Sequence, residues 1–404
     1  MDSLIYWFKP YIFGFKKFLI SFQVETYVLI ILPAIWILIS CFFEKSILLF
    51  LLESKKDFIL WSFFYGGYLI KIGFILFSLY FYFKLASWVG FWLGKKISKD
   101  DSPSTTHLKQ FLLSVAYIML AIGLYNVVFS LTLRQVAATS TRTSIIAASQ
   151  LYMSMDDKIF GGYPQIWIQK FSMSNILDYL LIQAYSKLPL FLAIVLIGLL
   201  CFNKLYFRKF LIAIFIAPFL AMPFWYALPA VSPNEMYRNN IFSVSSISTT
   251  QKQYEEAVTS KRLQTYLHDL EEAIANPHQK YPLIFTNPSM HVAWGTIITY
   301  FAIILWWPLG FIFIPWLIFN ILSTLYTLQH YAVDLPCGFV CAIIAIIITH
   351  YIFKFEKKYY TGHYRSLYFV NVVQDDVAFL KATLKTIWLK RRRSHVSNFK
   401  NDSD

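Results

Sequence analysis

Long apolar segments separated by short polar ones make up most of the chain. About eight of them are long enough for a helix to cross ~30 Å of hydrocarbon. They lie at Val24–Phe43, Phe58–Lys84, Lys109–Leu133, Leu180–Phe202, Phe210–Leu228, Met290–Trp306, Leu309–Leu328 and Val333–Phe353. Charged residues stand at the ends of most segments, and Lys71, near the middle of the second, is the exception. The pattern predicts an all-α integral membrane protein with about eight transmembrane helices.

Basic residues gather beside the apolar segments and indicate how the chain crosses the bilayer. They follow the second and eighth segments and occupy the link between the fourth and fifth: Lys95, Lys96, Lys99, Lys354, Lys357, Lys358, Lys204, Arg208 and Lys209. With eight crossings, these clusters and both termini lie on one side, which the positive-inside rule makes cytoplasmic. The long loops Arg134–Tyr179 and Pro229–Ser289 then face the opposite compartment.

The two long loops carry patterns of their own. In the second, apolar residues recur at helical spacing between glutamates, which predicts a surface helix over Gln251–Ala275. In the first, the glycines and proline of Asp157–Pro164 predict a turn, and the apolar residues after it predict a helix at the membrane interface. Met1–Gln23 mixes aromatic residues with lysines and lacks a cleavage site, so we expect an interfacial segment and no signal peptide there.

These patterns divide the chain into three parts. Residues 1–107 are expected to hold the interfacial segment and two added transmembrane helices. Residues 108–354 are expected to form a six-helix membrane domain, with the non-cytoplasmic loops 134–179 and 229–289. Residues 355–404 are expected to form a basic cytoplasmic tail.

The composition agrees with residence in a membrane. Hydrophobic residues make up 57% of the chain and charged residues 14%, whereas a soluble domain carries roughly 25% charged residues. The net charge of +14 does not indicate nucleic-acid binding, because the basic residues lie beside apolar segments and in the block Lys390–Arg393, as in contacts with anionic lipid. The four cysteines lie in apolar segments and form no metal-type pair. We therefore expect a membrane partner, and no nucleic acid, metal or cofactor.

Two short polar strings carry histidines at the ends of apolar segments. One, around His291, opens the sixth segment, and the other, Ser323–Asp334, joins the seventh segment to the eighth. The sixth and seventh segments form a hairpin through Trp307-Pro308. His291 and His330 therefore return to the same membrane face, at the non-cytoplasmic ends of neighbouring helices.

The residue types in these strings favour phosphoryl chemistry. His330 and Asp334 are four residues apart, which puts both on one face of a helix. A carboxylate bonded to one ring nitrogen makes the other a better nucleophile, able to attack phosphorus and form a phosphohistidine. His291 can give a proton to the leaving oxygen, and Ser289 with the first amides of the sixth segment can hold phosphate oxygens. Ionisable groups at membrane depth are costly, so three of them at one face indicate a functional site.

Both strings resemble a known family. Pro288-Ser289-x-His291 and His330-x-x-x-Asp334 are similar to the second and third signature motifs of the type 2 phosphatidic acid phosphatase superfamily, which shares its helical core with vanadium haloperoxidases. The resemblance implies a six-helix core formed by the third to eighth segments, with two helices added in front. It implies a metal-independent enzyme with His330 as the nucleophile, Asp334 as its partner and His291 as the acid.

The chain also departs from the phosphatase branch of that superfamily. Thr324 stands where the branch has an arginine, and the first motif, Lys-x6-Arg-Pro, is absent after the fifth segment. Together with the Asp157–Pro164 loop and the triplet Gln329–Tyr331, these departures resemble the inositol phosphorylceramide synthase-like branch of sphingolipid synthases. That branch transfers a phosphate-bearing head group between lipids.

The basic residues that the phosphatase branch carries in its first and third motifs are absent here, so the negative charge of a bound phosphate lacks its usual partners. Arg134, Arg142 and Arg238 lie on the predicted side of the membrane and are the candidate phosphate ligands beside Ser289. The alternative is that these arginines only face lipid head groups. Lys71, on the added helices, is assigned to helix packing or lipid contact.

The sequence therefore predicts a membrane lipid phosphotransferase that moves a phosphoryl or phosphate-bearing head group between lipids through a phosphohistidine. Two alternatives stay open: a lipid phosphate phosphatase, in which water is the acceptor, and a non-catalytic lipid-binding or transport protein on the same fold. The expected partners are a lipid phosphate and a lipid or water acceptor. Residue usage favours a bacterial inner membrane with a periplasm-facing site, and a Golgi-type membrane with a lumenal site is the alternative.

Overall fold

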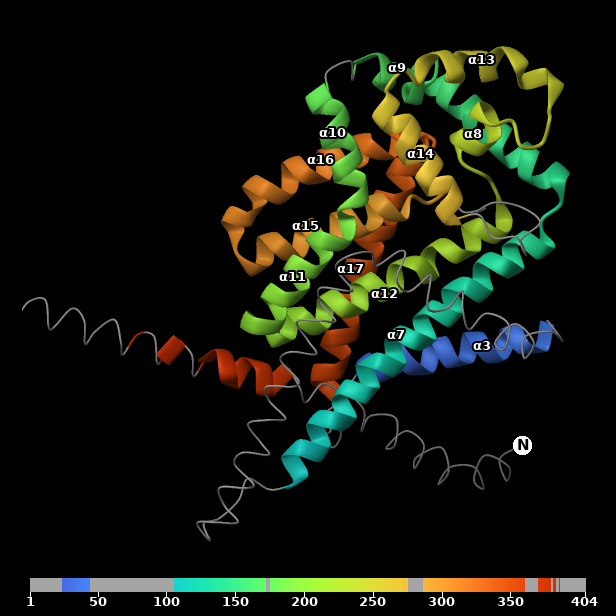
Figure 1. The fold of residues 1–404 in the computed structure, drawn as a ribbon. Helices are drawn as coiled ribbons and strands as arrows, with labels where there is room; N and C mark the ends of the chain where they lie inside the picture. The colour runs from blue at the N-terminus through green and yellow to red at the C-terminus, as the bar shows by residue number, and fades with distance from the viewer. Residues whose placement is uncertain are drawn as a thin grey trace, which may run out of the picture.

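The structure, a computed structural model, describes residues 24–43, 105–171, 175–274, 286–359 and 370–378, together with residues 381, 382 and 385. Within these ranges every regular element is a helix, as the sequence predicted (Figure 1). The predicted segment Phe58–Lys84, which contains Lys71, and the basic block Lys390–Arg393 lie outside the described residues.

Four helices form the centre of the described fold. They are α12 (Lys204–Ala227), α15 (Met290–Leu305), α16 (Gly310–Tyr326) and α17 (Asp334–Tyr359). α15 packs against α12, α16, α17 and α11 (Leu188–Phe202), and most of its side chains are buried because it is apolar on all sides. A 3₁₀ turn, Trp307–Leu309, joins α15 to α16, which confirms the predicted hairpin.

Three of the described helices are long and apolar enough to cross a membrane: α12, α17 and the stretch Trp307–Tyr326, which contains α16. α10 (Asn175–Ser186) and α11 qualify as one further span, but they meet at a bend of 56°. The predicted segment Leu180–Phe202 is therefore bent, because the helix is interrupted at Lys187 and a new one starts at Leu188-Pro189. The described residues form a multi-pass membrane protein with three or four spans, and the number eight stays a prediction.

The N-terminal helices pack along the side of the core. The π-helical turn Tyr27–Ile31 and α3 (Leu32–Phe43) lie against α7 (Thr105–Thr139). Trp36 Nε1 donates a hydrogen bond of 3.1 Å to Thr132 Oγ1, which joins α3 to α7. α7 is longer than the apolar segment that predicted it.

A buried ion cluster ties the first described helix to the core. Arg208 of α12 donates to both carboxylate oxygens of Glu25, at 2.7 Å for Nη2 to Oε2, and to Glu356 Oε1 of α17 at 2.5 Å. The sequence pattern placed Arg208 in a short link between two apolar segments, but the residue lies inside α12 and is buried. Only Asn203 separates α11 from α12, because its side chain caps the new helix at once.

A cap of four helices covers one end of the core (Figure 1). They are α8 (Arg142–Phe160), α9 (Pro164–Phe171), α13 (Ser248–Ala257) and α14 (Lys261–Ile274). The turn predicted after Asp157 and the helix that follows it are both present. The prediction of one surface helix over Gln251–Ala275 is wrong, because Ser260 starts a second helix by accepting the Leu263 amide at 3.1 Å.

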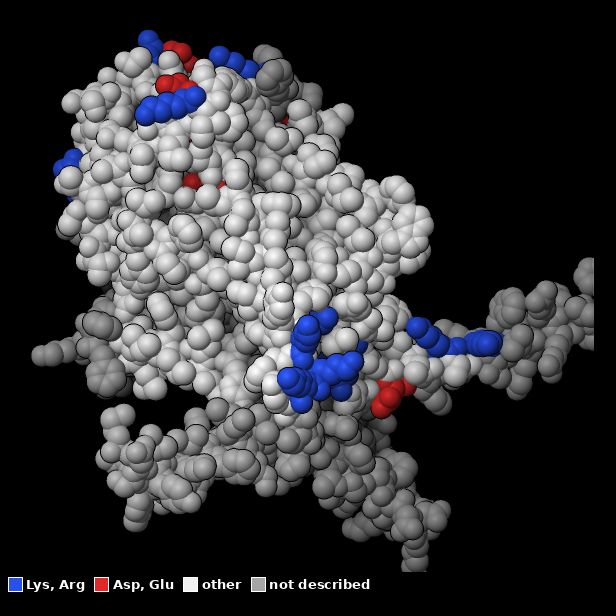
Figure 2. Space-filling view, turned by 180° about the vertical axis from the view of Figure 1, so that it is seen from behind, with Lys and Arg blue, Asp and Glu red and all other residues white. Residues whose placement is uncertain are grey.

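Charge is distributed unevenly over the face drawn in Figure 2. Charged side chains of both signs stand on the cap, a wide zone with few charges follows, and a patch of Lys and Arg lies below it. Lys357 and Lys358 end α17, whereas Asp334 begins it, and its 26 residues span about 39 Å. Asp334 and these two lysines therefore lie at opposite ends of one membrane-length helix.

Candidate active site

His291 stands in the first turn of α15. Ser289 is the N-cap of this helix, and its hydroxyl accepts the amide of Val292 at 3.5 Å. Ser289 is fully buried, and its own amide donates to the carbonyl oxygen of Asp334 at 3.2 Å. The start of α15 is thereby joined to the start of α17.

His330 lies in the loop between α16 and α17. Leu328 takes a left-handed φ of 56°, and the amide of His330 donates to the carbonyl oxygen of Thr324 at 3.3 Å. Because α17 begins only at Asp334, the prediction that His330 and Asp334 share one face of a helix is wrong. The loop brings them together instead, with His330 Nδ1 3.4 Å from Asp334 Oδ2.

The structure brings the two predicted histidines together. The ring centroids of His291 and His330 are 6.2 Å apart, and the ring planes make an angle of 61°. A single phosphate group can contact both rings at that separation. Tyr185 of α10 stacks on His291 with centroids 3.9 Å apart and planes at 14°. Tyr185, which no motif in the sequence singles out, holds the His291 ring from one side.

A backbone carbonyl orients the His330 ring. Nδ1 of His330 lies 2.9 Å from the carbonyl oxygen of Thr286. Because a carbonyl oxygen can only accept, Nδ1 carries the proton and Nε2 keeps its lone pair. The sequence predicts this orienting role for Asp334. Asp334 Oδ2 lies 3.4 Å from Nδ1 and also accepts the amide of Tyr331 at 2.9 Å, so Thr286 shares the role with Asp334.

A second buried carboxylate, Asp156 of α8, lies beside the same loop. It accepts the amides of Ala332 and Val333, each at 2.9 Å, and the side-chain amide of Gln165 at 2.6 Å. Burial raises the pKa of Asp156, and these bonds oppose the rise. Asp156 was not predicted as a site residue, although it continues a stripe of buried residues along α8. The stripe consists of Ile145, Ala148, Ser149, Tyr152 and Met153.

The predicted phosphate-binding arginines have different surroundings. Arg238 Nη1 pairs with Glu271 Oε1 at 3.4 Å. Arg142 is exposed and donates to the carbonyl oxygen of Phe242. Arg134 lies inside α7, and its side chain is outside the described part of the structure. Their roles as phosphate ligands stay predictions.

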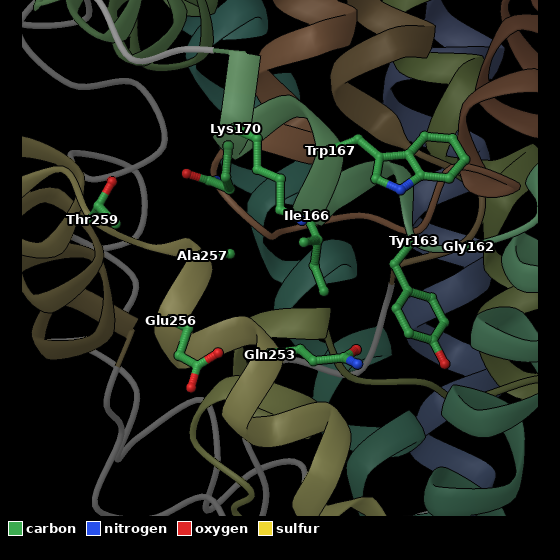
Figure 3. Close-up of a pocket in the computed structure, with 10 residues that line it drawn as sticks. Gly162, Tyr163, Ile166, Trp167, Lys170, Gln253, Glu256, Ala257 and Thr259 are labelled. Carbon is green, nitrogen blue, oxygen red and sulfur yellow. The ribbon is translucent and has the colours of Figure 1, made fainter.

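A cleft of about 680 Å³ opens in the cap between α9 and α13 (Figure 3). Its walls include Tyr163, Ile166, Trp167, Lys170, Gln253 and Glu256. The cleft is distinct from the histidine site, because neither His291 nor His330 lines it. From α9, Gln165 lies 3.4 Å from the His330 carbonyl oxygen, so this helix connects the cap to the site. In the described ranges, no group of three or more His, Cys, Asp and Glu residues is arranged to hold a metal.

Several helices long and apolar enough to cross a membrane define a multi-pass membrane protein, and two imidazoles and a buried carboxylate form a polar site where α15, α16 and α17 meet. Residues 150–348 match the PAP2 superfamily, so the chain contains a PAP2 superfamily domain. The match runs from α8 into α17 and includes His291, His330 and Asp334. The superfamily implies a metal-independent, phosphatase- or phosphotransferase-type activity on phosphate esters. No curated protein and no solved structure is significantly similar to the chain.

Proposed function

We propose that the chain is a membrane lipid phosphotransferase that moves a phosphoryl or phosphate-bearing head group between lipids through a phosphohistidine. One observation carries this proposal. Inside a PAP2 domain, the rings of His291 and His330 lie 6.2 Å apart, with Asp334 Oδ2 3.4 Å from His330 Nδ1. A phosphate between the two rings meets a nucleophile on one side and a proton donor on the other.

The reaction has two balanced halves. In the first, the Nε2 lone pair of His330 attacks phosphorus, the bond from phosphorus to the leaving oxygen breaks, and His291 gives its proton to that oxygen. The carboxylate of Asp334 stabilises the positive charge that the His330 ring gains. In the second, the acceptor hydroxyl gives its proton to His291 and attacks phosphorus, and the phosphorus–nitrogen bond breaks. Both histidines return to their starting protonation states.

Two features favour transfer to a lipid over hydrolysis. Thr324 occupies the position of the arginine of the phosphatase branch, and its hydroxyl bonds to the carbonyl oxygen of Ile321 at 2.7 Å. His330 is 6% exposed and Asp334 is fully buried, which limits the access of water to the intermediate. These features support the sphingolipid synthase-like branch, in which the acceptor is the hydroxyl group of a second lipid.

Phosphate binding is assigned to Ser289 and the first amides of α15, where the helix dipole favours an anion. Among the arginines, Arg238 is the leading candidate because it lies on the segment after α12, whose Asn234 amide donates to the Leu328 carbonyl oxygen at 3.0 Å. That bond brings the Arg238 segment beside the loop that carries His330. Arg238 would exchange Glu271 for the phosphate when substrate binds.

We assign the site to the non-cytoplasmic face of the membrane, in a bacterial inner membrane the periplasmic face. The separation of Asp334 from Lys357 and Lys358 along α17 supports this orientation, because basic residues favour the cytoplasmic side.

Trapping of the covalent intermediate tests the proposal. Purified protein is incubated with a lipid donor carrying ³²P, denatured, and digested, and the labelled peptide is identified by mass spectrometry. We expect an acid-labile label on His330, no label in His330→Asn, and a large loss of turnover in His291→Ala. His350→Ala is the matched control, because His350 lies within α17, where its Nδ1 is 2.9 Å from the Ile346 carbonyl oxygen.

The products of the same incubation distinguish the three candidate functions: transferase, phosphatase and non-catalytic protein. Label that passes from protein to an added lipid alcohol supports the transferase. Label released as inorganic phosphate, whether or not a lipid alcohol is present, supports the phosphatase. Unlabelled protein with intact lipid donor, at every acceptor tested, supports the non-catalytic alternative and contradicts the proposal.

A further inference from the structure

A buried carboxylate in the cap holds the loop that carries His330. Asp156 of α8 is fully buried, and its Oδ1 accepts the amide of Val333 while its Oδ2 accepts the amide of Ala332, each at 2.9 Å. Both amides belong to the loop between α16 and α17 and lie 176 and 177 positions later in the chain. These two bonds connect the cap directly to the catalytic loop.

Further hydrogen bonds fix the rest of this loop. Gln165 of α9 donates to Asp156 Oδ2 at 2.6 Å, and the same Nε2 lies 3.4 Å from the His330 carbonyl oxygen. On the other side, Asp334 Oδ2 accepts the amide of Tyr331 at 2.9 Å. The amides of residues 331, 332 and 333 are therefore all bound by carboxylates. A loop fixed at successive peptide groups holds the His330 ring in one position.

The turn between α8 and α9 explains how Asp156 and Gln165 meet. Gly161 takes a φ of 70° and Gly162 one of 154°, values that L side chains rarely adopt. A Cβ atom on Gly162 would also come within 2.8 Å of the Trp167 ring. The turn reverses the chain, so that Gln165, nine positions after Asp156, returns to its carboxylate. The glycine motif thus serves to assemble this pair.

We infer that Asp156, acting with Gln165, is a positioning residue for the chemistry of His330. The effect of Asp156 on the reaction rests on the proposed function, whereas its hydrogen bonds to the loop do not depend on that function. The carboxylate is needed because it accepts both loop amides at once, and an asparagine would turn its NH₂ group toward one of them. Hydrogen bonds to a carboxylate are also roughly twice as strong as neutral ones.

Asp156→Asn tests this role, and Asp157→Asn is the matched control, because Asp157 is the adjacent residue but is exposed. Gln165→Met is a second variant that keeps the side-chain size and removes both contacts of Gln165. Hydrogen–deuterium exchange is followed by mass spectrometry on the full-length protein in detergent, in peptides covering residues 328–336. We expect exchange in this loop to be about 10- to 100-fold faster in Asp156→Asn and unchanged in Asp157→Asn.

The rate of lipid phosphotransfer is the second measurement. In Asp156→Asn we expect kcat to fall by about 10- to 100-fold while KM stays within about 2-fold, because a misplaced nucleophile affects the transition state more than binding. Gln165→Met is expected to lower kcat by less, in the same direction. Asp157→Asn is expected to keep the wild-type kcat and KM.

The two measurements separate the possible failures. Unchanged exchange of the loop in Asp156→Asn would overturn the hold on the loop, whatever the activity. Faster exchange with unchanged kcat would overturn the positioning role. Wild-type protein without transfer and without label on His330 would overturn the proposed function, and the exchange data would still decide whether Asp156 holds the loop. Faster exchange along the whole chain of Asp156→Asn would mean that this substitution destabilises the entire fold. In that case the loop exchange and the kcat of Gln165→Met test the proposal by the same criteria.

Discussion

The Nδ1 atom of His330 lies 2.9 Å from the carbonyl oxygen of Thr286, a residue 44 positions earlier in the chain. This contact fixes the tautomer of the imidazole, because the carbonyl oxygen can only accept a hydrogen bond and Nδ1 must therefore carry the proton. Thr286 stands just before α15, and His330 stands just before α17, so the bond also joins the segments that lead into both helices. The lone pair of Nε2 is thereby available for attack on phosphorus.

The contact with Thr286 leads to a prediction for Asp334. In Asp334→Asn we expect kcat to fall by about 10- to 100-fold, because the tautomer is still fixed while the negative charge beside the ring is lost. When a carboxylate alone sets the tautomer, the loss is nearer 10⁴-fold. Single-turnover rates of phosphohistidine formation measure the difference. A loss of about 10⁴-fold in a folded variant would show that Asp334, and not Thr286, governs the tautomer.

Gly338 is expected to be essential for the approach of α15 to α17. A Cβ atom at this position would overlap the carbonyl oxygen of Ser289 and lie 3.2 Å from Cβ of Val292. Gly338→Ala should therefore move the start of α15, with His291, away from α17, and we expect activity to fall by about 100-fold. Gly310→Ala is the control, because its new Cβ would lie 3.4 Å from the flexible side chain of Ile303. Equal activity of the two variants would contradict the prediction.

Glu235 gives a prediction for pH dependence. Burial raises the pKa of Glu235 from its ordinary 4.5 to about 8, and the charge of Glu271 contributes in the same direction. The carboxyl group is then neutral in the folded chain and ionised in the unfolded chain between these two values. Its contribution to stability is complete below pH 4.5 and is lost as the pH rises through 8. Glu235→Gln should therefore melt at a higher temperature than wild type at pH 9.

Thermal unfolding followed by tryptophan fluorescence from pH 5 to 9 measures this effect. The difference in Tm between wild type and Glu235→Gln should grow with pH and be small or reversed at pH 5. Glu256→Gln is the control, because Glu256 is 67% exposed, and the Tm of this variant should stay close to that of wild type. A difference for Glu235→Gln that is constant across the range would refute the assignment.

The ion cluster around Arg208 is expected to control the stability of the N-terminal attachment. Arg208→Leu leaves the buried carboxylates of Glu25 and Glu356 without their partner, at a cost of about 3–5 kcal/mol. Replacing all three residues by leucine should recover most of that loss, because no buried charge remains. Denaturation in detergent compares the two variants with wild type. If Arg208→Leu were as stable as wild type, the ion cluster would contribute nothing to the stability of the fold.

Much of the helical framework could be predicted from the sequence. α15 begins at the predicted residue, Met290, and α16 and α17 each begin one residue after the predicted start, because a continuous apolar stretch is readily recognised in the sequence. The predictions failed where a single capping residue redirects the chain. Asn203 starts α12 early, and Ser260 divides the predicted surface helix in two. Such caps act through one side chain and leave the apolar pattern almost unchanged.

The amino-acid sequence by itself determined that the chain is helical and apolar, and that a hairpin returns His291 and His330 to one end of neighbouring helices. Those features depend on local periodicity and on the length of apolar segments. Only the tertiary structure decided which atoms orient His330: the carbonyl oxygen of Thr286 and, through the loop amides, the carboxylate of Asp156. These partners are far away along the chain, and only the packing of α8, α15 and α17 brings them to hydrogen-bonding distance.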